Sequence, residues 1–240
     1  MGNKNNPTEE SFLKDVSKHS MEILLDNGVY RHLRFTNNGS NVMRFDIVTY
    51  PGHLVYSGDM GSFVFSRLND MFEFFRTGNR EDGKLSINLG YWSEKLESVD
   101  RGDSNQSNGY KEFSSERFKF TVNEHVDEWI EEFKEEYDSD EKEAEKQRNT
   151  LAEELRAAVE DEITSRADDG EYEARRALSE FSFTFNGPDR FSPTNGQKYE
   201  FYDTWEWDFG EYTYRFIWCL YAIVWAIKEY DILPAKDEEE

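Results

Sequence analysis

The sequence predicts an α+β fold. An N-terminal antiparallel β-meander of about five strands packs against amphipathic helices, and long acidic helices follow it. Short alternating apolar segments, separated by turns that contain glycine, fill residues 20–66. Helical spacing of the apolar residues begins at Leu68. Aromatic residues make up 16% of the chain, which supplies enough bulky apolar area for a core although 33% of the residues are charged.

The strands come first, after a short helix over 8–18 with Thr8 as its N-cap. Asn27-Gly28 and Pro51-Gly52 each stand between two apolar runs, which is typical of a β-hairpin. Turns this short join antiparallel neighbours. The five predicted strands span residues 21–25, 29–35, 42–50, 53–56 and 62–65.

Helices dominate the rest of the chain. Leu68, Met71, Phe72 and Phe75 fall on one helical face, and the later helices show the same spacing. The further helices are predicted over 91–99, 114–137, 141–166, 171–178 and 212–230, with a strand over 181–185 and loops over 100–111 and 187–196.

We expect four regions. Residues 1–112 form the sheet and its covering helices, and residues 113–180 form an acidic helical region. Residues 181–233 are expected to pack on the sheet as an aromatic segment and a buried helix, and residues 234–240 to be a disordered acidic tail.

Negative charge is concentrated in the helical region. The chain has 51 acidic and 28 basic residues, a net charge of −23. Residues 121–180 hold 22 acids and 8 bases, whereas residues 21–80 hold 6 of each. Such a field repels nucleic acid and anionic membrane and attracts basic protein surfaces. Adaptation to high salt would spread the acids over the whole surface, which the neutral balance of residues 21–80 argues against.

The predicted partner-binding site lies on the 114–137 helix and the segment after it. Glu124, Glu128, Glu131 and Glu135 recur at steps of four, three and four, which places them on one helical face. Like charges at this spacing destabilise a helix, so their clustering calls for a reason. A solvated helix face is the alternative. The predicted partner-binding residues are Glu124, Asp127, Glu128, Glu131, Glu132, Glu135, Glu136, Asp138, Asp140, Glu141, Glu143, Trp205 and Trp207.

His53 and Asp59 are the alternative catalytic pair, because glycine-rich loops bracket them. Arg31, Arg44 and other bases of the neighbouring strands, His32 and Arg34, could hold an anion beside them. No nucleophile motif or phosphate loop accompanies the pair. Turn chemistry that fixes the hairpins is therefore the favoured interpretation, and no catalytic residue is predicted.

Other classes of site are not expected. The single cysteine, Cys219, excludes an internal disulfide and a cysteine metal cluster, and we expect a buried, inert thiol. The four histidines are scattered without metal-binding spacing, so neither a metal nor a cofactor is predicted. The longest apolar run, residues 216–227, is short of the roughly 20 residues that span a bilayer.

The segment YPGHLVYSGDMGSFVFSRL at residues 50–68, followed by MFEFF at 71–75, resembles a protein family widespread in bacteriophages and prophages. The similarity continues through INLGYWSEKL at 87–96 and YRFIWCLYA at 214–222 to KEYD at 228–231, and so covers most of the chain. The family has no settled activity, so the resemblance implies no catalytic residues in this chain. The resemblance implies a phage protein that acts in the cytoplasm of the bacterial host.

Together, charge and resemblance predict a non-enzymatic, acidic inhibitor of a bacterial nucleic-acid-handling defence system, anti-CRISPR or anti-restriction, that acts by DNA mimicry. Its partner would be the basic nucleic-acid-binding surface of a host defence protein, with no direct contact to nucleic acid or membrane. Long amphipathic helices would also allow a homodimer. The alternatives are a phage enzyme that acts on a nucleotide or signalling molecule through His53 and Asp59, and a phage structural or assembly protein.

Overall fold

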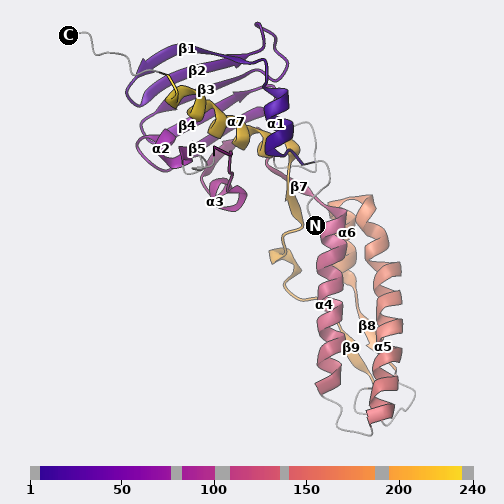
Figure 1. Cartoon of the computed structure of the whole chain (residues 1–240). Coiled ribbons are helices and arrows are strands. Elements are labelled where there is room, and N and C mark those ends of the chain that lie inside the picture. The colour runs from indigo at the N-terminus through magenta and orange to yellow at the C-terminus, as the bar shows by residue number, and fades with distance from the viewer. Residues whose placement is uncertain (1–5, 77–82, 101–108, 136–140, 187–194, 234–240) are drawn as a thin grey trace, which may run out of the picture. The chain divides into compact units, whose positions relative to one another are not determined.

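A six-stranded antiparallel sheet forms the N-terminal part of the computed structural model, which describes residues 6–76, 83–100, 109–135, 141–186 and 195–233 (Figure 1). The fold is α+β, and the strands follow one another in chain order, so the predicted meander is confirmed. The strands are β1 (Ser20–Asn27), β2 (Tyr30–Thr36), β3 (Phe45–Tyr50), β4 (His53–Gly58), β5 (Gly61–Ser66) and β6 (Leu96–Val99).

Two glycines of the sheet show why its turns need this residue. Gly52 follows Pro51 between the paired residues Tyr50 and His53 and has a φ of 84°, the left-handed conformation that glycine adopts without cost. A Cβ on Gly58 would clash with the carbonyl oxygen of Arg44. The glycines of this hairpin region are thus accounted for by backbone geometry.

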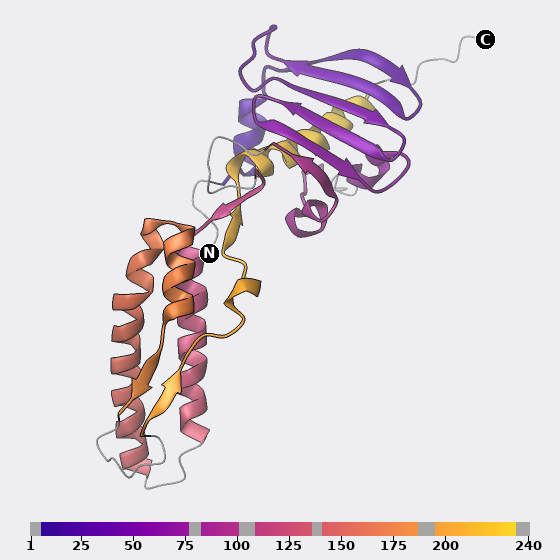
Figure 2. The ribbon, with the colours of Figure 1, turned by 180° about the vertical axis from the view of Figure 1, so that it is seen from behind.

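All helices that pack on the sheet cover the same face of it (Figures 1 and 2). They are α1 (Glu9–Asp15), α2 (Met71–Phe75), α3 (Leu89–Ser93) and α7 (Tyr214–Asp231). The predicted Thr8 cap is present, since its hydroxyl accepts a hydrogen bond from the Ser11 backbone. In α7, the fully buried Trp218 meets Phe45 of the sheet edge-on, with ring centroids 5.8 Å apart. The predicted buried helix therefore lies at the centre of this core.

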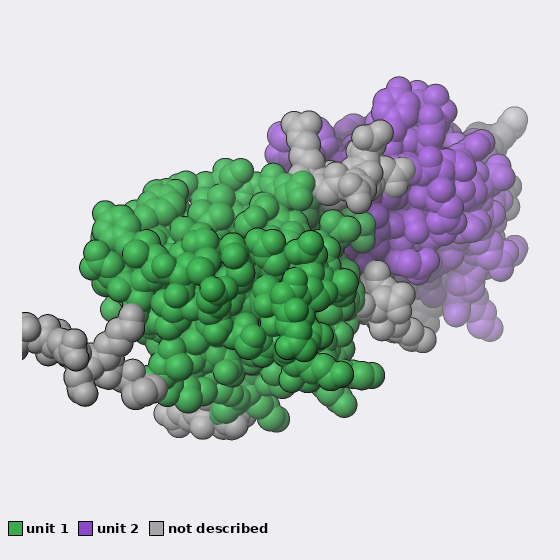
Figure 3. All heavy atoms as spheres, turned by 90° about the horizontal axis from the view of Figure 1, so that it is seen from above, with its two compact units in different colours: residues 1–112, 212–240 green, residues 113–211 purple. Residues whose placement is uncertain are grey.

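A second compact unit holds the acidic helices. Unit 1 comprises residues 1–112 and 212–240, and unit 2 comprises residues 113–211 (Figure 3). Unit 2 contains α4 (Ser115–Glu135), α5 (Glu141–Glu162), the 3₁₀ helix η2 (Thr164–Asp169), α6 (Glu171–Glu180), the paired strands β8 (Phe183–Phe185) and β9 (Gln197–Tyr199), and the 3₁₀ helix η3 (Thr204–Glu206). Two paired strands, β7 (Lys111–Phe113) and β10 (Gly210–Tyr212), occur where the chain passes between the units.

Two expectations are corrected. The helix predicted over 91–99 ends at Ser93, and Leu96–Val99 forms β6, which pairs with β5. Among the described residues of the segment 181–233, α7 and Tyr212 pack in the core beneath the sheet. The first part of this segment belongs to unit 2, where Phe181, Phe185 and Phe201 join the hydrophobic cluster of α4 and α5. The expected tail, 234–240, lies outside the described residues.

None of the helices in the described ranges is both long enough and apolar enough to cross a lipid bilayer. The apolar run of residues 216–227 is instead the buried middle of α7.

Candidate functional site

The solvent-facing side of α4 carries a row of carboxylates. Its opposite side is buried through Phe118, Val122, Val126, Ile130 and Phe133, which pack in the hydrophobic cluster of unit 2. Side chains four residues apart share a helical face, so this apolar row leaves the acidic row exposed. We define the acidic surface of α4 as its exposed carboxylates Glu124, Asp127, Glu128, Glu131 and Glu132.

Bases compensate part of this surface. Arg156 of α5 lies 2.7 Å from an Asp127 oxygen, and His125 Nδ1 lies 3.1 Å from Glu128. Both pairs are largely exposed, and ion pairs of that kind contribute little and weaken in salt. The acidic surface of α4 is therefore neither folded inward nor cancelled by these neighbours.

The charge of unit 2 sets it apart from unit 1. Residues 113–211 hold 29 acids and 12 bases, a net of −17, whereas the rest of the chain holds 22 acids and 16 bases, a net of −6. Helices α4 and α5 carry 7 and 8 acids against 3 and 4 bases, a net of −8. Over the 22 residues of α5, about 33 Å at 1.5 Å per residue, that is about one net charge per 4 Å. The two strands of duplex DNA together carry one per about 1.7 Å, so the two helices together reach somewhat under half the charge density of the duplex.

The structure does not describe the side chains of the remaining predicted acids. Glu136, Asp138 and Asp140 lie outside the described residues, and so do the side chains of Glu135, Glu141 and Glu143. The structure therefore brings together the part of the predicted acidic site that lies on α4.

The two predicted tryptophans have different surroundings. Trp205 in η3 is 76% exposed. Trp207 is partly buried, because its ring stacks on His125 at 4.1 Å between centroids and meets Phe201 and Phe209 edge-on. Trp207 thus holds the η3 segment against α4, and Trp205 is the exposed one of the two.

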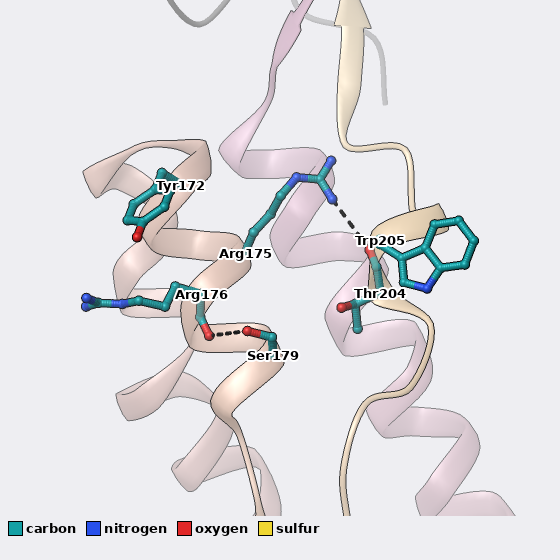
Figure 4. Close-up of a pocket in the computed structure, with 6 residues that line it drawn as sticks. All are labelled: Tyr172, Arg175, Arg176, Ser179, Thr204 and Trp205. Atoms are coloured by element: carbon teal, nitrogen blue, oxygen red, sulfur yellow. Dashed lines mark hydrogen bonds between the residues drawn. The ribbon is translucent and has the colours of Figure 1, made fainter.

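A pocket of about 350 Å³ opens beside Trp205 (Figure 4). Helix α6 supplies one side and η3 the other. Two exposed aromatic side chains flank it, Tyr172 and Trp205. The lining residues are Tyr172, Arg175, Arg176, Ser179, Thr204 and Trp205.

Arg175 fixes the two sides of this pocket to one another. Its guanidinium donates to the carbonyl oxygens of Thr204 and Trp207 at 3.4 and 3.3 Å, and its Nε donates to Glu171 at 2.8 Å. The same group lies 4.8 Å from the centre of the Phe209 ring. Of this site, sequence reasoning found only Trp205, because the contacts of Arg175 with the η3 segment join residues about thirty positions apart.

His53 and Asp59 are not brought together. His53 is the first residue of β4 and Asp59 follows its last residue, so the two lie about 20 Å apart at the rise of a strand. His53 stacks on Tyr50 and its Nε2 lies 3.1 Å from Glu97. Asp59 accepts a hydrogen bond from the Met43 backbone at 2.8 Å. The geometry contradicts an acid–base pair of these two residues.

The bases predicted to hold an anion instead hold the protein's own carboxylates. His32, Arg34 and Arg44 surround Asp46, at 2.8, 2.9 and 3.5 Å. Burial raises the pKa of Asp46, but hydrogen bonds from Arg34 and His32 and the positive charges outweigh it, and the pKa lies below its ordinary value. Arg31 forms a two-pronged pair with Asp70.

Among the residues that the structure describes, no group of three or more His, Cys, Asp and Glu side chains is placed to hold a metal ion. Cys219 is fully buried, and burial raises the pKa of its thiol well above the ordinary value. A protonated, buried thiol is inert, as the sequence predicts.

The segment that resembles a phage and prophage family, residues 50–68, forms the hairpins from β3 to β5. Its Gly52 and Gly58 have the structural roles described above, and the family assignment stays an expectation. Comparisons of the chain with protein-family models, with curated proteins and with solved structures find no match.

Proposed function

We propose that this chain is a phage- or prophage-encoded inhibitor of a bacterial nucleic-acid-handling defence system, of the CRISPR or restriction kind. It acts in the host cytoplasm and blocks the Lys- and Arg-lined nucleic-acid site of its target. The observation that supports this most is the exposed row of carboxylates on α4, in a unit with a net charge of −17.

One-signed charge along two long helices is the feature that suits a nucleic-acid site. Together α4 and α5 carry about one net negative charge per 4 Å of helix length, somewhat under half the density of duplex DNA. A groove lined with lysines and arginines would attract carboxylates gathered in this way. Attraction of this kind speeds association and weakens in salt.

The enzymatic alternative loses its main support, because His53 and Asp59 lie at opposite ends of β4. The four bases around them are also engaged, three with Asp46 and Arg31 with Asp70. Among the described residues of unit 1, the candidate catalytic pair and the bases beside it are thus engaged in contacts within the fold.

A titration tests the proposal. Increasing amounts of the chain are added to fixed amounts of restriction endonucleases and CRISPR effector complexes, and cleavage of a labelled DNA is followed. For its target, we expect inhibition to saturate at a fixed molar ratio and to be independent of preincubation time. Inhibition that grows with time at substoichiometric amounts would contradict occupation and indicate an enzyme.

A further inference from the structure

The pocket between α6 and η3 has few hydrogen-bond donors that are available to a ligand. Arg175 already donates to Glu171 and to two backbone carbonyl oxygens. Arg176 lies 2.7 Å from Glu173. The three acceptors hold the Arg175 guanidinium in place, so it is not free to turn to a phosphate or carboxylate ligand, although the exposed Arg176–Glu173 pair is itself weak. The negative field of unit 2 disfavours such ligands further.

The flanking aromatics are of the type that anchors protein partners. Tyr172 and Trp205 are each 76% exposed, and the Trp205 indole points away from α6, so the space between the two segments stays open (Figure 4). Trp, Tyr and Arg are the residue types enriched at binding hot spots. A recess of about 350 Å³ is large enough for one aromatic side chain.

From these contacts we propose that the pocket between α6 and η3 receives an aromatic side chain of a basic partner protein. The inference rests on the proposed function, which supplies the basic partner, and adds to it the contact that gives specificity. Charge complementarity identifies the partner class: a chain bearing lysines and arginines is attracted to unit 2, and its apolar anchor fills the pocket. A nucleotide, with its phosphate, is the ligand that this field excludes.

Two peptides test the proposal on the full chain. Each has four lysines on either side of a central residue, tryptophan in one and alanine in the other, and dissociation constants are measured by fluorescence anisotropy in about 150 mM salt. We expect the tryptophan peptide to bind about 5- to 30-fold more tightly, which corresponds to about 1–2 kcal/mol for one interface side chain. Equal affinities would contradict the proposal that the pocket binds an aromatic side chain, but would not contradict electrostatic binding by the acidic surface of α4.

A variant that fills the pocket tests whether the preference for the tryptophan peptide over the alanine peptide arises there. Ser179→Phe places a ring in the pocket and should abolish the preference for tryptophan without changing the affinity for the alanine peptide. Ser165→Phe is the matched control, because Ser165 is also exposed and also donates to a backbone carbonyl one turn earlier, yet does not line the pocket. A preference that survives in Ser179→Phe would overturn the assignment.

A neutral probe separates this proposal from the proposed function. If neither peptide binds, the electrostatic attraction fails, and N-acetyltryptophanamide then tests the pocket alone. Its titration into ¹⁵N-labelled protein should shift the backbone amide resonance of Thr204, which lines the pocket, in the parent and not in Ser179→Phe. An unmoved resonance, or displacement of the probe by AMP, would overturn the pocket as an apolar anchor site.

Discussion

Reversing three charges of the acidic surface of α4, in the variant Glu124→Lys, Glu128→Lys and Glu131→Lys, is expected to weaken binding to the target about 100-fold at low salt. An exposed charge pair contributes about 0.5 kcal/mol, so replacing the attraction by an equal repulsion costs about 1 kcal/mol per reversal and about 3 kcal/mol for the three, and 1.4 kcal/mol is a factor of ten. The three side chains are exposed, so the fold should be kept. Affinities measured between about 50 and 300 mM salt should also show a flatter dependence on salt.

A second triple variant separates the surface from total charge. Glu22→Lys, Glu73→Lys and Glu94→Lys reverse three exposed acids of unit 1 and change the net charge equally. We expect this control to bind within about threefold of the parent, since its three charges belong to the other unit and not to the proposed binding surface. Equal losses in the two variants would mean that net charge alone acts, and unchanged affinity in the first would exclude the acidic surface of α4.

Replacing Arg31 by alanine is expected to lower the free energy of unfolding by about 3 kcal/mol, the lower end for removing one partner of a buried ion pair. Arg31 is 7% exposed, and its two terminal nitrogens lie 3.0 and 2.9 Å from the Asp70 oxygens. Its guanidinium also lies 4.4 Å from the centre of the Phe72 ring. The change thus leaves the Asp70 carboxylate without its main partner and opens a gap beside α2. Urea unfolding measures the loss, with Arg67→Ala as an exposed control.

The pH dependence distinguishes the lost ion pair from lost packing. Burial raises the pKa of Asp70, but hydrogen bonds from Arg31 and from the Phe72 backbone, with the positive charge, bring it below its ordinary value. The pair therefore stabilises the fold above about pH 4, and this stabilisation is lost as the pH falls through the lowered pKa. The difference between parent and Arg31→Ala should narrow in acid. A difference that is constant down to about pH 2 would assign the loss to packing.

Local signals predicted most of the elements. Alternating residues and the Asn27-Gly28 and Pro51-Gly52 turns indicated the strands of the meander, and the four-residue spacing of Leu151, Leu155 and Val159 indicated α5. Strand β6 was missed because its residues also fit a helical face. Its pairing with β5, about thirty residues earlier, decides its conformation, and pairing at that distance is not readable from the segment itself.

The same limit applies to the sites. The exposed row on α4 was predictable, since one helix contains both its buried and its acidic side. The aromatic content of residues 181–211 indicated that they are part of a hydrophobic core, but composition does not distinguish the core of the sheet from that of the helices. Phe185 and Phe201 pack in the hydrophobic cluster of unit 2. The bases predicted to hold an anion meet Asp46 because Arg34 pairs with it across β2 and β3. The predicted strands 29–35 and 42–50 are neighbours in the meander, so a pairing of Arg34 with Asp46 could have been predicted from the sequence.

Competition with nucleic acid tests the central claim most directly. Binding of the chain to the target nuclease is measured at increasing concentrations of the nuclease's own DNA or guide RNA. The account predicts that the apparent dissociation constant of the chain rises in proportion to the nucleic-acid concentration, with no complex that contains all three molecules. A stable ternary complex, in which the chain binds with unchanged affinity while the nucleic acid is in place, would contradict it.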